Sequence, residues 1–190
     1  MVGAMAKSVK QTDADDIVLR ARTEAEALGQ LYELYYERIF RFCVHRLFSK
    51  EVAEDVTSII FLEVASRISS FEGQTEQDFR YWLYAIAANQ ANAYIRKTSR
   101  RKKLLAEAVG SMTDVTTDNA SEPDWPRLYA AILKLKPEHQ TIITLRFFEN
   151  MEFEQIAKIL DAKEATLRVT LHRMLGKLRK HLETVFEGEL

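Results

Sequence analysis

Two stretches of this sequence are rich in arginine and lysine, the side chains that bind phosphate groups. One is RKTSRRKK at residues 96–103, and the other covers residues 163–181. The whole chain has a formal net charge of −1, because residues 13–78 are mostly acidic. A polyanion could therefore bind at these two places without a general attraction to the rest of the chain.

Catalytic chemistry has poor candidates in this chain. The four histidines fall in separate helical contexts, and none belongs to a metal-binding helix motif. Cys43 is the only cysteine and lies among aromatic residues of a predicted helix, which favours a buried thiol over a nucleophile. There is no phosphate-binding glycine loop. We therefore predict a protein that is not an enzyme and that needs no metal or other cofactor.

Helices must position the basic residues, since strands have little support. The sequence has six glycines and three prolines, and no run of strict apolar alternation bounded by turns. Apolar residues instead recur at helical spacing on both sides of residues 104–124, a stretch rich in Ser, Thr, Asp and Pro. We predict an all-α protein of two small helical domains, residues 14–103 and 125–186, joined by a flexible linker at 104–124. The domains could be spread apart or packed together.

Residues 152–182, EFEQIAKILDAKEATLRVTLHRMLGKLRKHL, predict two short helices separated by a turn. Apolar residues mark one buried face on each helix: Phe153, Ile156, Ala157 and Leu160 on the first, and Leu167, Leu171, Met174, Leu175 and Leu178 on the second. Asp161 in the turn tolerates a left-handed backbone better than most residues. This is the plan of a helix-turn-helix, whose second helix enters the major groove of DNA. The alternative is a solvent-facing basic helix at the edge of an ordinary bundle.

The exposed residues of the second helix divide by chemistry. Those near its start could meet base edges, because Arg pairs with guanine, Glu accepts from cytosine and apolar groups touch the thymine methyl. These are Glu164, Ala165, Arg168 and Val169. The later cations, Arg173, Lys177 and Arg179, are better placed to hold phosphates.

A family resemblance emerges when this helix pair is set beside two earlier stretches. They are AEDVTSIIFLEVASRISSFEG at 53–73 and FRYWLYAIAANQANAYIRK at 79–97. Together the three resemble bacterial RNA polymerase sigma factors of the extracytoplasmic-function (ECF) group, which have two helical domains, regions 2 and 4, joined by a flexible linker. The resemblance covers about residues 28–182, and its most specific part is the W-L-x-x-I-A-x-N pattern that begins at Trp82.

The resemblance implies two DNA contacts. The helix that begins near Trp82 would contact the non-template strand of the minus-ten promoter element, while residues 71–79 match the loop that captures a flipped-out base. Its candidate residues are Trp82, Ile86 and Asn89, with the basic tail Arg96, Lys97, Arg100 and Arg101 for phosphates. In the second domain, Lys163, Glu164, Arg168 and Val169 match exposed positions of the helix that reads the minus-thirty-five element.

The resemblance also implies protein partners. AEDVTSIIF matches the stretch that binds the clamp of core RNA polymerase, with Asp55 and Phe61 at the acidic and aromatic positions. Ser58 and Ile59 stand where the family commonly has Gln-Glu. An anti-sigma factor that covers these surfaces is implied as well.

We therefore predict a sigma factor that binds core RNA polymerase, directs it to specific promoters and helps to melt the minus-ten element. One alternative is a sigma-like decoy that binds an anti-sigma factor without directing transcription, which the departures at Ser58 and Ile59 leave open. Another is a repressor that uses only the C-terminal helix pair, with the first domain for dimerisation. A lone cysteine and the lack of a signal or of a segment with roughly 20 apolar residues predict the bacterial cytoplasm and no membrane insertion.

Overall fold

The computed structural model describes the backbone of residues 11–109 and 125–186, with side chains at 14–100 and 128–180. No strand occurs in these ranges, which confirms the all-α prediction. The elements are α1 (Gln11–Arg20), α2 (Ala25–Leu47), α3 (Lys50–Arg67), the 3-10 turn η1 (Ile68–Ser70), α4 (Glu76–Val109), α5 (Trp125–Leu133), α6 (Pro137–Ile143), the π-helical turn η2 (Thr144–Phe148), α7 (Phe153–Leu160) and α8 (Glu164–Phe186).

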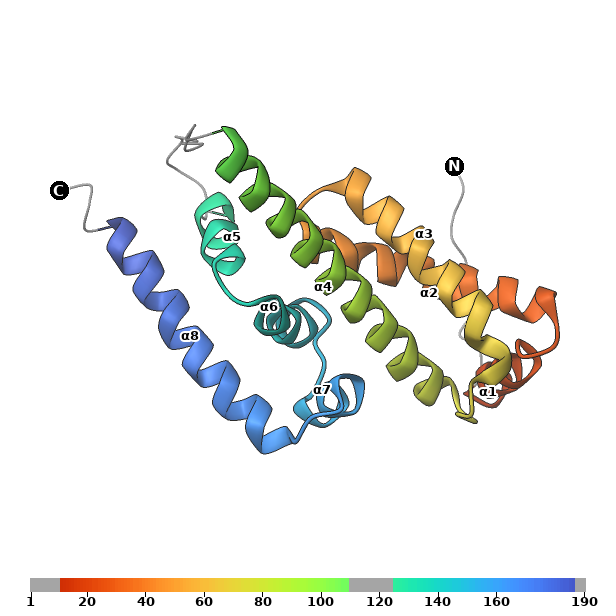
Figure 1. Cartoon of the computed structure of the whole chain (residues 1–190). Helices are drawn as coiled ribbons and strands as arrows, with labels where there is room; N and C mark the ends of the chain where they lie inside the picture. Colours follow the sequence, from red (N-terminus) through yellow and green to blue (C-terminus); the bar gives the residue numbers. More distant parts are fainter. Residues whose placement is uncertain (1–10, 110–124, 187–190) are drawn as a thin grey trace, which may run out of the picture.

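The first domain consists of α1 to α4, which pack around a shared apolar core (Figure 1). Helices α2 and α3 are separated by only two residues. Phe48 ends α2 in the left-handed region (φ 55°, ψ 25°), and the hydroxyl of Ser49 then caps α3 by accepting from the Val52 N–H at 3.4 Å. This sharp turn brings α3 back against α2, so that Ile39 and Ile60 are both fully buried.

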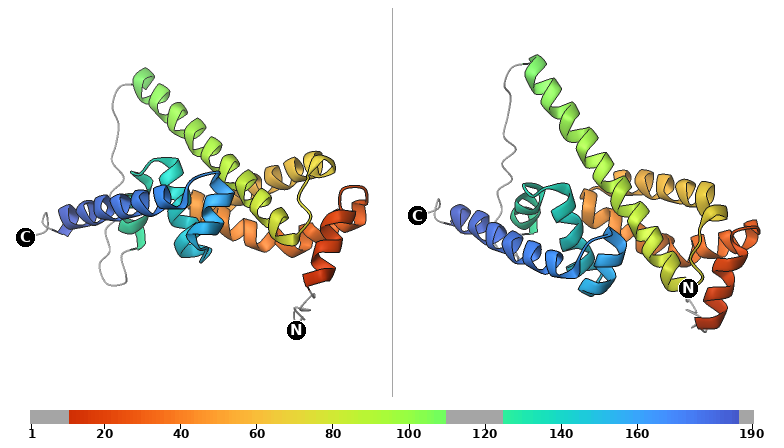
Figure 2. Two further views of the ribbon diagram at one scale, coloured as in Figure 1. Left: turned by 90° about the horizontal axis from the view of Figure 1, so that it is seen from below. Right: turned by 60° about the horizontal axis from the view of Figure 1, so that its bottom comes forward.

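Helix α4 is the longest element, with 34 residues, or roughly 50 Å at 1.5 Å per residue. In both views of Figure 2 its C-terminal end extends past the other helices of the first domain. The helix includes residues 104–109, which the sequence prediction assigned to the linker. These residues, LLAEAV, are mostly strong helix formers, which explains why the helix continues there. The other predicted linker residues, 110–124, lie outside the described ranges.

The second domain consists of α5 to α8. Pro137 is the first residue of α6, where a missing N–H is tolerated. Helix α6 continues into η2, and Asn150 then reverses the chain with φ 52°. Ile142, Leu145 and Ile156 contribute to the core beneath α8.

The two domains are packed together, which the sequence had left open. Helices α6 and α7 contact α4, η2 contacts α2, and α8 lies on the outer side (Figure 1). At the centre of the interface is Arg46, which is 1% exposed. Its Nη1 donates to Gln140 Oε1 at 2.8 Å, and its Nη2 donates to Asn92 Oδ1 at 2.6 Å and to the Pro137 carbonyl at 3.1 Å.

Aromatic and polar contacts extend this interface in both directions. The His45 ring lies 4.3 Å from Phe148, centroid to centroid. Tyr84 donates its hydroxyl to Glu149 Oε2 at 2.6 Å, and burial, followed by the negative charge of Glu149, raises the pKa of this tyrosine above its usual range. The contact is therefore substantially polar, a composition typical of interfaces between domains that can separate.

Candidate nucleic-acid interface

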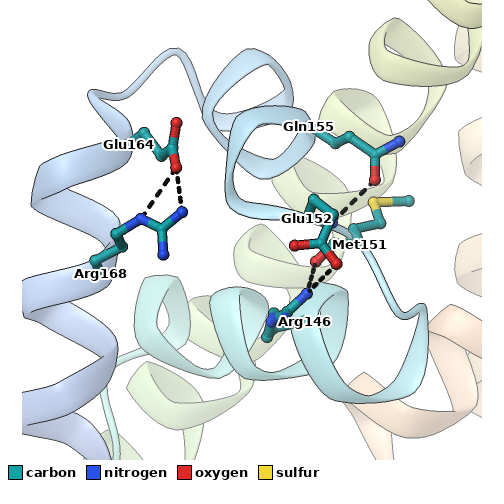
Figure 3. A network of polar contacts seen from close by, with 6 residues as sticks. All are labelled: Arg146, Met151, Glu152, Gln155, Glu164 and Arg168. Atoms are coloured by element: carbon teal, nitrogen blue, oxygen red, sulfur yellow. Dashed lines mark hydrogen bonds and ion pairs between the residues drawn. The ribbon is translucent and has the colours of Figure 1, made fainter.

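The helix-turn-helix of the second domain forms as predicted. Glu152 and Gln155 make a reciprocal cap at the start of α7, in which the Glu152 N–H donates to Gln155 Oε1 at 2.9 Å (Figure 3). Asp161 then ends α7 in the left-handed region, with φ 47° and ψ 52°. Asp161 therefore occupies the position where such turns often contain glycine, because Asp tolerates this conformation better than most residues.

Four of the five predicted core residues of α8 are buried: Leu167, Leu171, Met174 and Leu178. Leu175 was predicted to join them but is 40% exposed, so that expectation was wrong. At about 100° per residue, Leu175 lies about 80° from Leu167 around the helix, farther from the centre of the stripe than the others.

The opposite side of α8 is open to solvent. Ala165, Val169 and Arg173 lie within about 80° of the direction opposite to Leu167, and Val169 is 50% exposed. Lys163 and Lys177 are exposed as well, while Glu164 is half-buried. Small and apolar groups therefore lie at the centre of this face, with cations around them.

Arg168 and Glu164, both candidates for reading bases, are paired with each other. Arg168 donates through Nε and Nη2 to Glu164 Oε1, the first at 3.0 Å (Figure 3). Its guanidinium carbon also lies 4.6 Å from the centre of the Phe153 ring. An exposed pair of this kind contributes at most about 1 kcal/mol, so a base edge could replace the carboxylate at low cost.

Arg146 of η2, in the same domain, supports this site, a role that sequence reasoning missed. Its Nη1 donates to the Met151 carbonyl at 2.8 Å and to Glu152 Oε1 at 3.0 Å, and its guanidinium carbon lies 5.3 Å from the Phe153 ring centre. Arg146 thus ties the end of η2 to the start of α7 (Figure 3). The sequence signal was an arginine six residues before a helix-capping Glu, which is not specific.

On α4, the predicted minus-ten residues differ in exposure. Trp82, Asn89 and Arg96 recur every seven residues and share one side of the helix. Asn89 is exposed, and Trp82 is half-buried, with its ring 4.9 Å from that of Phe71. Ile86 is only 4% exposed, so in this conformation it supports the helix from the core and offers no surface.

The basic tail of α4 lies beside the second domain. Arg96 Nη1 forms an ion pair with Glu138 Oε1 of α6 at 3.0 Å, and both side chains are more than half exposed. Lys97 and Arg100 are exposed. The side chain of Arg101, also predicted to bind phosphate, lies outside the described residues.

The loop before α4 is held by a network of hydrogen bonds. The Asp78 carboxylate accepts from the N–H groups of Gln74 and Thr75, each at 3.1 Å, and its own N–H donates to Thr75 Oγ1 at 3.1 Å. Hydrogen bonding from the Thr75 hydroxyl lowers the pKa of Asp78 below its usual range, with backbone N–H groups adding to this effect. Asp78 is therefore occupied in capping the helix.

Helix α1 and the turn that follows it also fix this loop, and the sequence gave no sign of that role. Arg22 donates to the Gly73 carbonyl, and the Glu76 N–H donates to Asp15 Oδ1 at 2.6 Å. A Cβ added at Gly73 would lie 2.3 Å from Phe71 Cζ and 2.6 Å from Asp78 Cβ, so only glycine fits without a shift. The loop is held on both sides.

The predicted polymerase-binding residues fall on different sides of α3. Asp55 is exposed, whereas Phe61 is 8% exposed, with its ring 4.8 Å from that of Tyr32. Asp55 shares its face with Ile59 and Leu62, at i+4 and i+7, which are 47% and 70% exposed. The face that a partner can reach therefore combines one carboxylate with two apolar side chains.

Other kinds of site find no support within the described residues. Among them, no group of three or more His, Cys, Asp or Glu side chains could hold a metal ion. None of the described helices is long and apolar enough to cross a membrane. Cys43 is fully buried, and its burial raises the pKa of the thiol to about 11, so it is not a reactive nucleophile.

Each domain matches one family description. Residues 31–101 match Sigma-70 region 2, and residues 126–178 match Sigma-70, region 4. An ECF RNA polymerase sigma-E factor from Haemophilus influenzae is 33% identical over 140 residues, which cover 67% of this chain and 73% of that protein. The ECF RNA polymerase sigma factor BldN from Streptomyces coelicolor is 30% identical over 175 residues, which cover 88% of this chain and 65% of BldN.

The fold has a solved counterpart. The sigma factor RpoE, in complex with the anti-sigma factor NepR from Bartonella quintana, matches with a TM-score of 0.60 and 18% identity, covering 82% of this chain and 96% of that one. At this identity the similarity concerns the fold alone. With both sigma-70 regions present in order and relatives of the same group aligned across most of the chain, this protein belongs to the extracytoplasmic-function group of bacterial RNA polymerase sigma factors.

Proposed function

We propose that this chain binds core RNA polymerase and directs it to promoters through two DNA-reading surfaces. The observation that carries the proposal is the presence of region 2 and region 4 on one chain, each with an exposed candidate reading helix, α4 and α8. As a member of its family the chain is a non-enzymatic transcription initiation factor. Its site of action is the bacterial cytoplasm, which contains the polymerase and the promoters.

At the minus-ten element, Asn89 and Trp82 on α4 contact the non-template strand, with Arg96, Lys97, Arg100 and Arg101 near its phosphates and Ile86 supporting them from the core. Among the polar residues at 71–79, the Glu76 carboxylate accepts from the Tyr35 hydroxyl of α2, and the Asp78 carboxylate accepts from the Thr75 N–H. Gln77 donates to the Tyr81 hydroxyl at 2.6 Å. Glu72 and Gln74 are exposed. Gln74, whose amide can both donate and accept, is our candidate for the edge of the flipped base.

At the minus-thirty-five element, α8 enters the major groove. Arg168 releases Glu164 to pair with guanine, Ala165 and Val169 meet a thymine methyl, and Lys163 reads alongside them. Arg173 and Lys177, farther along the helix, hold phosphates. The Arg168–Glu164 pair would keep the arginine extended before DNA arrives.

Polymerase binds to the exposed face of α3. Asp55 supplies the charged contact, Ile59 and Leu62 supply apolar contacts, and buried Phe61 supports this face from beneath. The apolar side chain of Ile59 can be buried against the polymerase at a position where the family commonly has a polar side chain. This departure from the family pattern is therefore compatible with polymerase binding. A partner of the anti-sigma class, as NepR is for RpoE of Bartonella quintana, would compete for these surfaces.

The alternatives are less well supported. A repressor would use only the helix-turn-helix, whereas the first domain matches sigma-70 region 2. A decoy would have no use for an exposed Asn89 or for the open reading face of α8. A transcription assay distinguishes the repressor and decoy hypotheses from the sigma-factor proposal.

The test mixes the protein with bacterial core polymerase and a promoter library and maps the new transcription starts. Arg168→Ala should lose about tenfold in discrimination at one upstream base pair, because a bidentate arginine contact contributes about 1–3 kcal/mol. Asn89→Ala should reduce strand opening, followed by permanganate reactivity, more than it reduces binding to the duplex.

Lys134→Ala is the matched control for both variants, because Lys134 is exposed in the turn after α5 and lies outside both reading surfaces. It should leave start sites and opening unchanged. No new starts with the wild-type protein would contradict the sigma-factor proposal. Unchanged output and base preference in both Arg168→Ala and Asn89→Ala would contradict only the residue roles.

A further inference from the structure

A polar cavity of about 520 Å³ lies between the two domains and has no part in the proposed promoter contacts. Arg38, Arg41 and His45 of α2 and Arg80 of α4 line its first-domain wall. Glu149, with the side-chain amides of Asn150 and Gln155, belongs to its second-domain wall. Anything that fills this cavity therefore touches both domains.

The charge of this cavity is strongly unbalanced. Its lining contains three guanidinium groups and a single carboxylate, that of Glu149, which already accepts from the Tyr84 hydroxyl. None of the three arginines forms an ion pair with any described carboxylate, and the Nε of Arg80 is buried without a hydrogen-bond partner. Several N–H donors thus remain available for an anion.

The groups of this lining also act on one another electrostatically. The positive charges of Arg38 and Arg80 oppose the raised pKa of Tyr84, which indicates that both lie near its hydroxyl. Burial lowers the pKa of His45, and Arg41 adds to that effect while Glu149 opposes it. The cations therefore converge on one region.

The cavity is separate from the proposed minus-ten surface. At about 100° per residue, Arg80 and Tyr84 lie about 160° from Trp82 around α4, on either side of the direction opposite to it. Asn89, seven residues after Trp82, returns to the side of Trp82. A DNA strand held by Trp82 and Asn89 would thus pass on the other side of the helix.

We propose that this interdomain cavity is a binding site for a small phosphate anion with more than one charge, either free pyrophosphate or the diphosphate of a nucleotide. The planar fork of arginine matches phosphate oxygens, so a cluster of three such forks can bind an anion through several charge-assisted hydrogen bonds, with Arg38 and Arg41 exposed at the opening and Arg80 partly buried. A volume of about 520 Å³ is within the range of small-molecule sites. Since both walls belong to the site, its ligand also favours the packed arrangement.

The test is calorimetric titration of the full chain with pyrophosphate, and separately with ADP, at constant ionic strength. Arg41→Gln and Arg80→Gln should each weaken pyrophosphate binding about tenfold, since each removes a charge-assisted contact. Lys134→Gln, the control with the same loss of charge outside the cavity, should bind as the wild type does. If ADP binds more tightly than pyrophosphate, the ligand of the cavity is the diphosphate of a nucleotide. If pyrophosphate binds more tightly, the ligand is the free anion.

Glu149→Gln supplies a second test, in which the affinity for pyrophosphate should rise instead of fall. It keeps an acceptor for Tyr84 but removes the negative charge, so pyrophosphate should bind several-fold more tightly. Wild-type affinity in the Arg41→Gln, Arg80→Gln double variant, or equal weakening by Lys134→Gln, would overturn the proposal. Circular dichroism establishes that each variant is folded, and none of these measurements depends on promoter activity.

Discussion

Arg46 shows how a single buried side chain can join two domains without a salt bridge. Its partners are the amide oxygens of Gln140 and Asn92 and one backbone carbonyl, all neutral. Burial lowers the pKa of this guanidinium to about 10, so Arg46 stays charged at neutral pH. A buried cation of this kind depends on every acceptor around it, because removal of one leaves its donor unsatisfied.

Gln140→Leu should therefore destabilise the protein by about 2–3 kcal/mol, since it leaves the Arg46 guanidinium short of an acceptor in the interface. Urea denaturation followed by circular dichroism measures the change. Gln74→Leu is the control, because Gln74 is exposed and its replacement should cost less than about 0.5 kcal/mol. Equal midpoints for the two variants would show that the Arg46 cluster does not stabilise the fold.

Among the helices, α4 combines several of the proposed roles. Its start is capped by the mutual hydrogen bonds of Thr75 and Asp78, its middle carries Trp82 and Asn89, and its later turns face α6. The cap also fixes the loop that contains Gln74. A change at the start of α4 should therefore affect both stability and the proposed base-binding loop.

The cap predicts a pH dependence. Folding lowers the pKa of Asp78 below its ordinary value of 3.8, so the carboxylate stabilises the fold above that pH and loses its effect as the pH falls through the lower, folded value. Asp78→Asn keeps an acceptor oxygen but loses the negative charge, so it should be less stable than the wild type at pH 6 by roughly 0.3–1 kcal/mol, the typical contribution of a carboxylate at a helix N-terminus. The difference should shrink as the pH falls below 3.8. Urea midpoints measured at pH 6 and at a series of lower pH values follow it, and a constant difference would contradict the assignment.

For the whole molecule, the packed arrangement conflicts with simultaneous reading of both promoter elements. Centres about 25 base pairs apart are separated by roughly 85 Å of B-form DNA, at about 3.4 Å per base pair. Helix α4, which spans only roughly 50 Å, contacts α6 and α7 along its length. We infer that the domains separate when the protein acts on a promoter.

A chemical cross-link tests this inference. Lys158 Nζ of α7 lies 5.6 Å from the ring centre of Tyr81 on α4, so cysteines at these two positions can be joined by a short bis-methanethiosulfonate reagent, which forms a disulfide with each thiol and is cleaved by a reducing agent. The buried thiol of Cys43 should not react. The cross-linked Tyr81→Cys, Lys158→Cys protein should lose transcription from promoters that need both elements and regain it when the linker is cleaved. The control is the Tyr81→Cys single variant treated with the same reagent, which cannot be cross-linked and should stay active. Full activity of the cross-linked double variant would contradict the inference that the domains separate.

The sequence by itself determined the features that depend on neighbours along the chain. Helical periodicity predicted the all-α fold, and Asp161 with its flanking apolar stripes predicted the helix-turn-helix. The string that begins at Trp82 predicted the family. These signals are local, because a helix face, a cap or a turn is specified within about one to three turns of chain.

Only the tertiary structure decided which side chains face a partner and how the domains meet. Phe61 and Ile86 are buried, while Ile59 and Leu62 are exposed. The difference arises because helices from other parts of the chain pack against one apolar face of each helix and leave the other face open. Arg46 forms a hydrogen bond with Gln140 across a separation of 94 residues, and the arginines line the same cavity as Glu149 only because the domains pack together. Such contacts join distant segments, so no local pattern of residues could have predicted them.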